Sequence, residues 1–288
     1  FLDTLVELMM LHRHNGQGTE APLYSNTDET NLFLDHAKKD TYVGGIMDMV
    51  SRRIYGFWAD LPQALLTGKA QNEIKHTGDN IFSELYKDNV RLEQFLEGMM
   101  GISAGNFRAF ASKFDFSKYQ THVDIGGATG QLSIFIAQEN PLMKSTSMDL
   151  PAVQPVTDKW IQSFGVQDRV ASGKVDFFKD SFPQADVITM GMILHDWNLS
   201  DKKMLIKKAY DALPEGGAYA VIEAIIDDER RVNTQGLCMS LNMLIEFGGD
   251  GGFDYTAADF TEWVLEAGFK RTEVLHLTGP SSAVIAYK

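Results

Sequence analysis

The stretch THVDIGGATGQLSIFIAQENP, residues 121–141, decides the fold. An apolar strand, His122–Ile125, runs into Gly126 and Gly127. A turn of small residues ends at Gly130, and a helical pattern follows. This order of strand, glycine turn and helix brings the backbone close to a ligand at the edge of a parallel sheet. The turn lacks the Gly-Lys-Ser/Thr ending of a P-loop, and its spacing is not Gly-x-Gly-x-x-Gly, so a nucleotide or dinucleotide site is disfavoured.

The composition is that of a globular, acidic protein. The chain has 288 residues, 44% of them hydrophobic, and a formal net charge of −13 from 26 basic and 39 acidic side chains. Nucleic-acid binders and membrane-surface proteins normally present a basic face, so the charge argues against both kinds of partner. The single cysteine, Cys238, excludes a disulfide within the chain and suits a reducing compartment. We therefore predict a cytoplasmic protein.

Residues 1–115 predict a mostly helical, winged-helix-like domain. Apolar residues recur at helical spacing, and QGTEAPLYSNT, residues 17–27, offers turn residues and one short strand as a wing. No apolar run approaches the ~20 residues of a membrane span, and no secretion signal is present. Because the chain starts at Phe1 within a helical pattern, we expect an N-terminal piece to precede it. The polar bridge DFSKYQ, residues 115–120, marks the boundary to a second domain, residues 116–288.

From residue 121 onward the pattern alternates between strand and helix. Such alternation predicts a doubly wound α/β fold, with a mostly parallel sheet covered by helices on both faces. The last two strands, KRTEVLHL and SAVIAYK, have no helix between them, which predicts an antiparallel hairpin at the sheet edge. The parallel strands are expected at His122–Ile125, Ser145–Met148, Val170–Val175, Asp186–Met190 and Tyr219–Glu223.

Each parallel strand ends on residues that can bind or react. Ligands of open α/β sheets sit outside the carboxyl ends of the strands. Asp149 ends the second strand, where an acid usually accepts hydrogen bonds from ribose hydroxyls. Asp176 and Phe177 end the third and suit an adenine amino group and ring. His195 and Asp196 follow the fourth, and Glu223 ends the fifth.

This set of residues suits a ligand that has a ribose and an adenine but no phosphate. S-adenosylmethionine (SAM) is such a ligand, and an acidic pocket tolerates its sulfonium cation. Methyl transfer is an in-line displacement, so positioning of the reactants supplies much of the catalysis. The turn glycines, together with Met190 and Gly191 at the end of the fourth strand, complete the expected cofactor site.

Four motifs resemble the dimeric SAM-dependent O-methyltransferase family, which includes caffeic-acid-type and acetylserotonin-type enzymes and bacterial relatives. The motifs are VDIGGATG, MDLPAV, the long stretch around GMILHDW, and GGFDYTAADFTEWVLEAGF. The similarity covers nearly the whole chain. It implies a winged-helix dimerisation domain at the N-terminus, a homodimer, SAM as cofactor, no metal and a small-molecule methyl acceptor.

The resemblance also implies roles for single residues. Gly126 would line the methionine part of SAM, and Asp149 with Leu150 would hold the ribose. His195 matches the family's general base, and Glu223 matches the acid that orients it. Asp254 stands where the family often has a second glutamate, and Gly191 stands where plant members often carry a lysine. The pair Asp176 and Phe177 would hold the adenine.

Several other residues are candidates for contacts with the methyl acceptor. Met239, Asn242 and Met243 lie on a nearly all-apolar helical stretch, which can also be plain core. Trp58 and the pair Arg52-Arg53 are further candidates, although packing and solvation also explain them. His12 and His14 fit a solvated turn better than a metal pair, and Asp227-Asp228-Glu229 fits a charged loop better than a magnesium site.

Three functions remain open at this point. Transfer of methyl to a hydroxyl oxygen, with His195 as base, is favoured because both His195 and Glu223 are present. Methylation of a thioether acid is the alternative, in which Arg52 or Arg53 would pair with a substrate carboxylate. A SAM-sensing winged-helix regulator is the third, and the net charge speaks against it.

Overall fold

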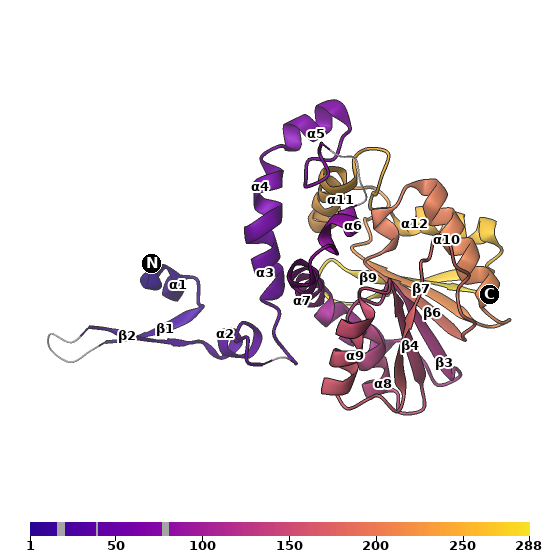
Figure 1. Cartoon of the computed structure of the whole chain (residues 1–288), viewed down its shortest axis with the longest axis horizontal. Helices are drawn as coiled ribbons and strands as arrows, with labels where there is room; N and C mark the ends of the chain where they lie inside the picture. The colour runs from indigo at the N-terminus through magenta and orange to yellow at the C-terminus, as the bar shows by residue number, and fades with distance from the viewer. Residues whose placement is uncertain (16–20, 39, 77–80) are drawn as a thin grey trace.

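The structure is a computed structural model that describes residues 1–15, 21–38, 40–76 and 81–288. An α/β body carries a helical layer over the carboxyl ends of its strands, and an N-terminal arm extends away from this body (Figure 1). In the part of the chain described, no helix combines the length and apolarity that crossing a bilayer requires.

The body is built on a seven-stranded sheet with the order β5-β4-β3-β6-β7-β9-β8. The five strands β3 to β7 are parallel, and β9 runs antiparallel to both β7 and β8, which confirms the predicted fold and hairpin. The strand order reverses direction between β3 and β6, and this switch point opens the crevice where ligands bind. The strands are β3 (Thr121–Ile125), β4 (Lys144–Asp149), β5 (Val170–Lys174), β6 (Val187–Gly191), β7 (Ala218–Glu223), β8 (Arg271–His276) and β9 (Ser282–Tyr287).

Helices bury both faces of the sheet. On β7, Tyr219 and Val221 pack into one core cluster with α10 and α12, whereas Ala220 and Ile222 pack into another with α7, α8 and α9. Both faces are apolar because side chains alternate along a strand and each face is covered. The helices are α8 (Gln131–Glu139), α9 (Gln154–Ser163), α10 (Leu199–Ala212) and α12 (Ala257–Ala267).

The helical layer lies over the carboxyl ends of the strands. Its longest member, α7, joins it to the body, because Phe110 stacks on Phe114 with ring centroids 5.2 Å apart inside the core of the sheet. The connection between α7 and β3 contains the predicted boundary at residue 115. The layer consists of α3 (Gly45–Met49), the π-helix η1 (Val50–Ile54), α4 (Tyr55–Trp58), α5 (Leu61–Thr67), α6 (Ile81–Leu85), α7 (Asn89–Lys113) and α11 (Thr234–Phe247).

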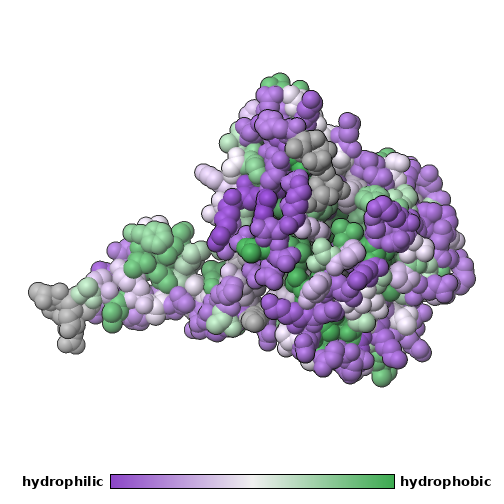
Figure 2. All heavy atoms as spheres, viewed as in Figure 1, coloured by the Kyte–Doolittle hydropathy of each residue, from purple (hydrophilic) through white to green (hydrophobic). Residues whose placement is uncertain are grey.

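The N-terminal arm contains α1 (Leu2–Glu7), β1 (Leu11–His14), β2 (Leu23–Asn26) and α2 (Asp28–Phe33). Neither α1 nor α2 buries a residue, and Figure 2 shows apolar residues gathered on the arm. The prediction of one strand was incomplete, since β1 and β2 pair as an antiparallel hairpin. The solvated turn expected at His12 and His14 is wrong, because both lie in β1, where His14 contacts the Ser25 hydroxyl at 2.8 Å. Residues 17–20 of the expected wing lie outside the described residues.

Candidate active site

The turn after β3 has no room for a side chain at Gly126 and Gly127. Gly126 has φ +74°, and a Cβ there would lie 2.5 Å from the Ile193 side chain. A Cβ on Gly127 would lie 2.2 Å from the Ser147 hydroxyl. Gly130 has φ +77° and precedes α8, but it does not line the cavity described below, so it shapes the turn from behind. The turn therefore exposes its backbone to a ligand.

Asp149 is fixed at the end of β4 by two backbone donors. Its Oδ2 accepts from the Ala128 amide at 2.8 Å, and its Oδ1 accepts from the Leu150 amide at 2.7 Å. Burial raises the pKa of Asp149 to about 6, and these two hydrogen bonds oppose the rise. Each carboxylate oxygen keeps a second lone pair, which can accept a hydroxyl from the cavity.

The end of β5 contributes an acid beside aromatic rings. The Asp176 carboxylate is bonded by Lys179 at 2.7 Å, and this contact holds its pKa below the usual range. The Phe177 ring packs edge to face on Trp197, with centroids 5.6 Å apart. Asp176 and Phe177 line the same cavity as Asp149, as the sequence predicted.

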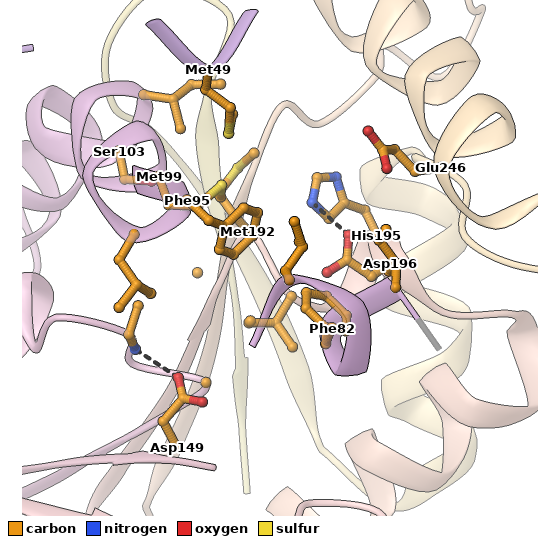
Figure 3. Close-up of a pocket in the computed structure, with 18 of the residues that line it drawn as sticks. Met49, Phe82, Phe95, Met99, Ser103, Asp149, Met192, His195, Asp196 and Glu246 are labelled. Atoms are coloured by element: carbon orange, nitrogen blue, oxygen red, sulfur yellow. Dashed lines mark hydrogen bonds and ion pairs between the residues drawn. The ribbon is translucent and has the colours of Figure 1, made fainter. Parts of the chain in front are cut away.

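These residues surround one cavity of about 950 Å³. In Figure 3, the carboxylate of Asp149 lies at one end, His195 and Asp196 lie at the other, and apolar side chains stand between them. This volume is at the upper end of the ~300–1,000 Å³ typical of small-molecule sites. The lining is rich in sulfur and aromatic side chains, namely Met49, Met99, Met100, Met192, Met239, Met243, Trp58, Phe82, Phe95, Phe107, Trp197 and Phe247.

His195 is held in a short 3-10 turn, Leu194–Asp196, directly after β6. Its imidazole is buried, with Nδ1 3.2 Å from Asp254 Oδ1 and Nε2 3.4 Å from Asp196 Oδ1. Asp254 therefore fixes the ring, although the sequence pattern left its role in doubt. Nδ1 makes a hydrogen bond to Asp254, whereas Nε2 makes only an ion pair with Asp196, so Nε2 is the nitrogen that can exchange a proton with a ligand.

Glu223 supports His195 in a different way from the one predicted. Its Oε1 accepts a hydrogen bond from the backbone amide of His195 at 3.0 Å, and no contact to the imidazole is recorded. It is fully buried at the end of β7, does not line the cavity and is therefore a backbone anchor. The strand periodicity places Glu223 beside His195, but it cannot tell a ring contact from a backbone contact.

Gly252 allows Asp254 to reach the imidazole. A Cβ on this glycine would lie 2.4 Å from the His195 carbonyl oxygen and 2.7 Å from that of Asp196. The loop that carries Asp254 therefore lies directly against the backbone of the histidine turn. This explains the glycine-rich sequence before Asp254 without any ligand in the loop.

The charges around His195 act on one another strongly. Burial opposes protonation of the imidazole, but Asp254, Asp196 and Glu223 outweigh it and raise the pKa of His195 to about 10. Burial raises the pKa of Asp196 to about 7 and also raises the pKa of Glu223. The carboxylates thus favour the protonated imidazole, which must lose this proton before it can act as a base.

The two arginines do not offer a free cation to a substrate. Arg52 lies outside the cavity lining, where it is exposed and 3.5 Å from Asp48, so the substrate contact predicted for it is wrong. Arg53 does line the cavity, but both Glu73 and Glu246 bind its guanidinium in a bidentate manner at 2.6 to 2.8 Å. Spacing alone could not show that these partners come from distant segments.

The candidates on α11 do reach the cavity. Met239, Asn242 and Met243 line it, and the Asn242 Oδ1 accepts from the Trp58 indole at 3.1 Å. The Asn242 amide nitrogen makes no hydrogen bond to the described residues and can donate to a ligand. Met190, in contrast, is fully buried in the core, where the Tyr219 hydroxyl contacts its sulfur at 3.1 Å, so it does not line the cofactor site.

The alternation of side chains along β6 explains why Met190 is buried whereas Gly191 reaches the cavity. Gly191 lines the cavity because the strand alternates, and a Cβ there would lie 2.5 Å from the Phe107 ring. Gly191 can therefore offer only its backbone.

The acidic stretch Asp227-Asp228-Glu229 is a charged loop, as predicted. Asp227 accepts hydrogen bonds from the amides of Arg231, Val232 and Asn233.

Asp124 and Met192 are among the cavity residues that the sequence analysis did not name, whereas Asp196 was placed with His195 just beyond the fourth strand. Asp124 lines the cavity from β3, with its Oδ1 bonded by the Thr189 hydroxyl at 2.6 Å and no recorded partner on Oδ2. Its position next to the glycine turn was the available signal. Asp196 lies beside the predicted base in the sequence. Met192 has φ +57°, a strained conformation for this residue, and no pattern predicts it.

Comparisons with known proteins agree with this geometry. The sequence model of the O-methyltransferase domain family matches residues 58–270. The chain is 34% identical over 288 residues to the tetracenomycin polyketide synthesis 8-O-methyl transferase TcmO of Streptomyces glaucescens, covering 100% of this chain and 81% of that protein. It is 30% identical over 260 residues to the 3-hydroxy-5-methyl-1-naphthoate 3-O-methyltransferase of Streptomyces sahachiroi, covering 90% and 73%.

A solved structure matches as well. Human N-acetylserotonin methyltransferase in complex with SAM aligns with a TM-score of 0.90 and 26% identity, over 100% of this chain and 81% of that chain. Fold and site therefore define a SAM-dependent methyltransferase. The chain belongs to the O-methyltransferase family, and it is an enzyme that transfers a methyl group from SAM to a small molecule.

We predict that Gly252→Ala lowers turnover of a phenolic acceptor by about 10²-fold, because the added methyl pushes Asp254 away from the His195 ring. Affinity for S-adenosylhomocysteine, measured by calorimetry, should stay nearly unchanged. Gly56→Ala is the matched control, since a Cβ there meets no atom within 4 Å. Wild-type turnover in Gly252→Ala would contradict the role of this close contact.

We also predict that affinity for S-adenosylhomocysteine rises as the pH increases through about 6 and is constant above it. The Asp149 carboxylate accepts hydroxyl hydrogen bonds better when ionised, and burial places its pKa at about 6. Calorimetry from pH 5 to 8 checks this. Asp149→Asn should bind roughly 10-fold or more weakly and lose this step. A step that persists in the variant would assign it to another group.

Proposed function

We propose that His195 is the general base of an O-methyl transfer to a phenolic hydroxyl. The observation that supports this is the buried imidazole, whose Nδ1 is fixed by Asp254 at 3.2 Å. Its Nε2 lies 3.4 Å from Asp196 and is the nitrogen for proton exchange with a ligand in the cavity that His195 lines. Asp254 orients the ring, and Glu223 orients its backbone through the His195 amide. His195 takes the hydroxyl proton as the methyl is transferred.

We assign parts of SAM to the strand ends. Gly126 and Gly127 would accommodate the methionine part, Asp149 and Leu150 the ribose, and Asp176 with Phe177 the adenine. Buried polar atoms without partners in this region support the assignment, among them the Thr129 hydroxyl. When bound, SAM supplies a methyl group activated on a sulfonium sulfur. Asp124 has a free carboxylate oxygen that can accept a hydrogen bond from the ammonium of the methionine part.

The timing of proton removal follows from pKa values. A phenol has a pKa of about 10 and an ordinary histidine about 6.5, so complete transfer beforehand would cost roughly 5 kcal/mol. The carboxylates around His195 raise the basicity of its ring and so reduce this cost. His195 loses its own proton more readily once a cation shares the cavity, because like charges repel.

The cavity favours an uncharged, polycyclic aromatic acceptor. Its methionine and aromatic lining suits flat apolar rings, and the Asn242 amide nitrogen can donate to a ring carbonyl. Its arginine and lysine, Arg53 and Lys179, are both ion-paired. The TcmO relative is named for polyketide synthesis, which supports a polycyclic aromatic acceptor.

The same observations disfavour the thioether acid. Its carboxylate needs a cation, but Arg52 is outside the cavity and Arg53 is bound by Glu73 and Glu246. A regulator that only senses SAM would not need the His195–Asp254 pair. The oxygen acceptor is the function that accounts for all of these residues.

We infer in addition that two copies of the chain associate through the N-terminal arm. Phe1, Met9 and Leu23 expose 93%, 81% and 71% of their surface, and the arm has no core of its own. Stable homodimer interfaces cover such apolar surface. Light scattering on the 288-residue protein should therefore give the mass of a dimer. The double variant Met9→Asp, Leu23→Asp should shift this mass toward that of a monomer. A monomeric wild type would contradict this inference.

We predict that His195→Ala lowers turnover of 1-naphthol by about 10²–10⁴-fold, with affinity for S-adenosylhomocysteine nearly unchanged. Wild-type turnover should rise with pH up to about 10, since the raised pKa of His195 keeps most of the imidazole protonated below that value. The variant should recover in part at high pH as the naphthol ionises unaided. A flat wild-type profile with a mild defect in His195→Ala would rule out His195 as the base.

A further inference from the structure

Lys202 on α10 is a fully buried lysine, with 0% of its surface exposed. Lysine is almost never fully buried unless its charge is compensated. Its ammonium donates to the carbonyl oxygen of Trp197. The same ammonium lies 3.8 Å from the centroid of the Phe253 ring and 5.6 Å from that of Tyr255. Lys202 does not line the cavity, so it has no contact with either reactant.

These contacts join the two segments that build the base. Trp197 follows the turn that carries His195, and Phe253 and Tyr255 flank Asp254. One ammonium thus holds both segments at the place where His195 and Asp254 meet. Cation–π contacts are strongest for a desolvated ammonium, so this clamp can hold a loop that is otherwise rich in glycine.

The charge of Lys202 also lies close to the carboxylates around His195. Three buried carboxylates face His195, from the 3-10 turn (Asp196), from β7 (Glu223) and from the loop (Asp254). Burial lowers the pKa of Lys202 to about 8, and the same three carboxylates, together with Asp201 on its own helix, oppose this and favour the ammonium. Glu246 on α11 is neutralised by Arg53, and Tyr255 is uncharged because burial raises its pKa well above the usual value.

We propose that Lys202 is a positioning residue for the transfer: its buried ammonium clamps the His195 turn to the Asp254 loop and offsets one of the three carboxylates around His195. This proposal rests on the proposed function of His195 as the base. Without the ammonium, the carboxylates hold the proton on the imidazole more strongly. The base is then free only at higher pH.

The direct test is a pH titration of His195 by NMR with histidine labelled at the imidazole carbon. The protein is saturated with a SAM analogue that carries an ammonium in place of the sulfonium, and the signal is assigned by its loss in His195→Gln. Lys202→Met keeps most of the aliphatic stem and removes the charge. Its titration midpoint should lie about one unit or more above that of the wild type. Lys203→Met, a partly exposed position on the same helix, is the matched control and should titrate as the wild type.

Turnover of 1-naphthol gives a second readout. The pH profile of kcat should move upward by the same amount in Lys202→Met, a loss of about tenfold per unit at neutral pH, while affinity for the SAM analogue stays unchanged. A variant with lower stability or kcat but an unshifted midpoint would overturn the proposal, because a purely structural role predicts that result.

A double variant covers the case in which Lys202→Met does not fold. Lys202→Met with Asp196→Asn removes one carboxylate together with the ammonium, so its midpoint should return toward the wild-type value. A midpoint well below the wild type would show that Lys202 has no influence on His195. Failure of the base assignment is seen separately, as unchanged turnover in His195→Ala, and the titration does not depend on it.

Discussion

The approach of the Gly252 backbone to the carbonyl oxygen of His195 is the contact on which the active site depends. A single methyl group at this position would lie 2.4 Å from that oxygen. Only through this contact can Asp254, from a loop late in the chain, reach the imidazole that follows β6. The sheet supplies the other half of the arrangement, because its strand order reverses between β3 and β6 and leaves the glycine turn opposite His195.

The electrostatics of the site follow from where each charge is placed. Acids gather at the two ends of the cavity, at Asp149 and around His195, whereas Arg53 is paired with two glutamates. Between them the wall is apolar. A cationic methyl donor and an uncharged phenol are compatible with such a cavity, and an anionic acceptor is not, since it would leave its charge without a partner.

Much of this could be predicted from the sequence, because the strand–helix alternation and the residues at the strand ends are local signals. The sheet, the hairpin and the places of Asp149, Asp176 and His195 follow from them. The contact of Glu223 with a backbone amide does not, since periodicity places a side chain at a strand end without orienting its oxygens. The error at Met190 shows the same limit: a shift of one residue along a strand exchanges the cavity for the core.

Contacts between distant segments were the least predictable. Arg53 is bound by Glu246, 193 positions away, and Lys202 on α10 contacts Phe253 in the loop that carries Asp254. Neither contact can be predicted from a single sequence, because charged residues on helices usually face water. The exposed N-terminal arm is a related case. The sequence shows that it has apolar residues, but not that they stay exposed in the described chain.

The most direct test of the account is to follow the methyl group. The enzyme is incubated with SAM carrying a ¹³C-labelled methyl and with 1-naphthol, a hydroxyanthraquinone and a methylthio-hydroxy acid in parallel, and the products are read by NMR. The account predicts a labelled methoxy group on the two phenols, formed faster on the larger ring system because it buries more apolar surface. It also predicts no labelled sulfonium from the thioether. Label on sulfur, with none on oxygen, would contradict it.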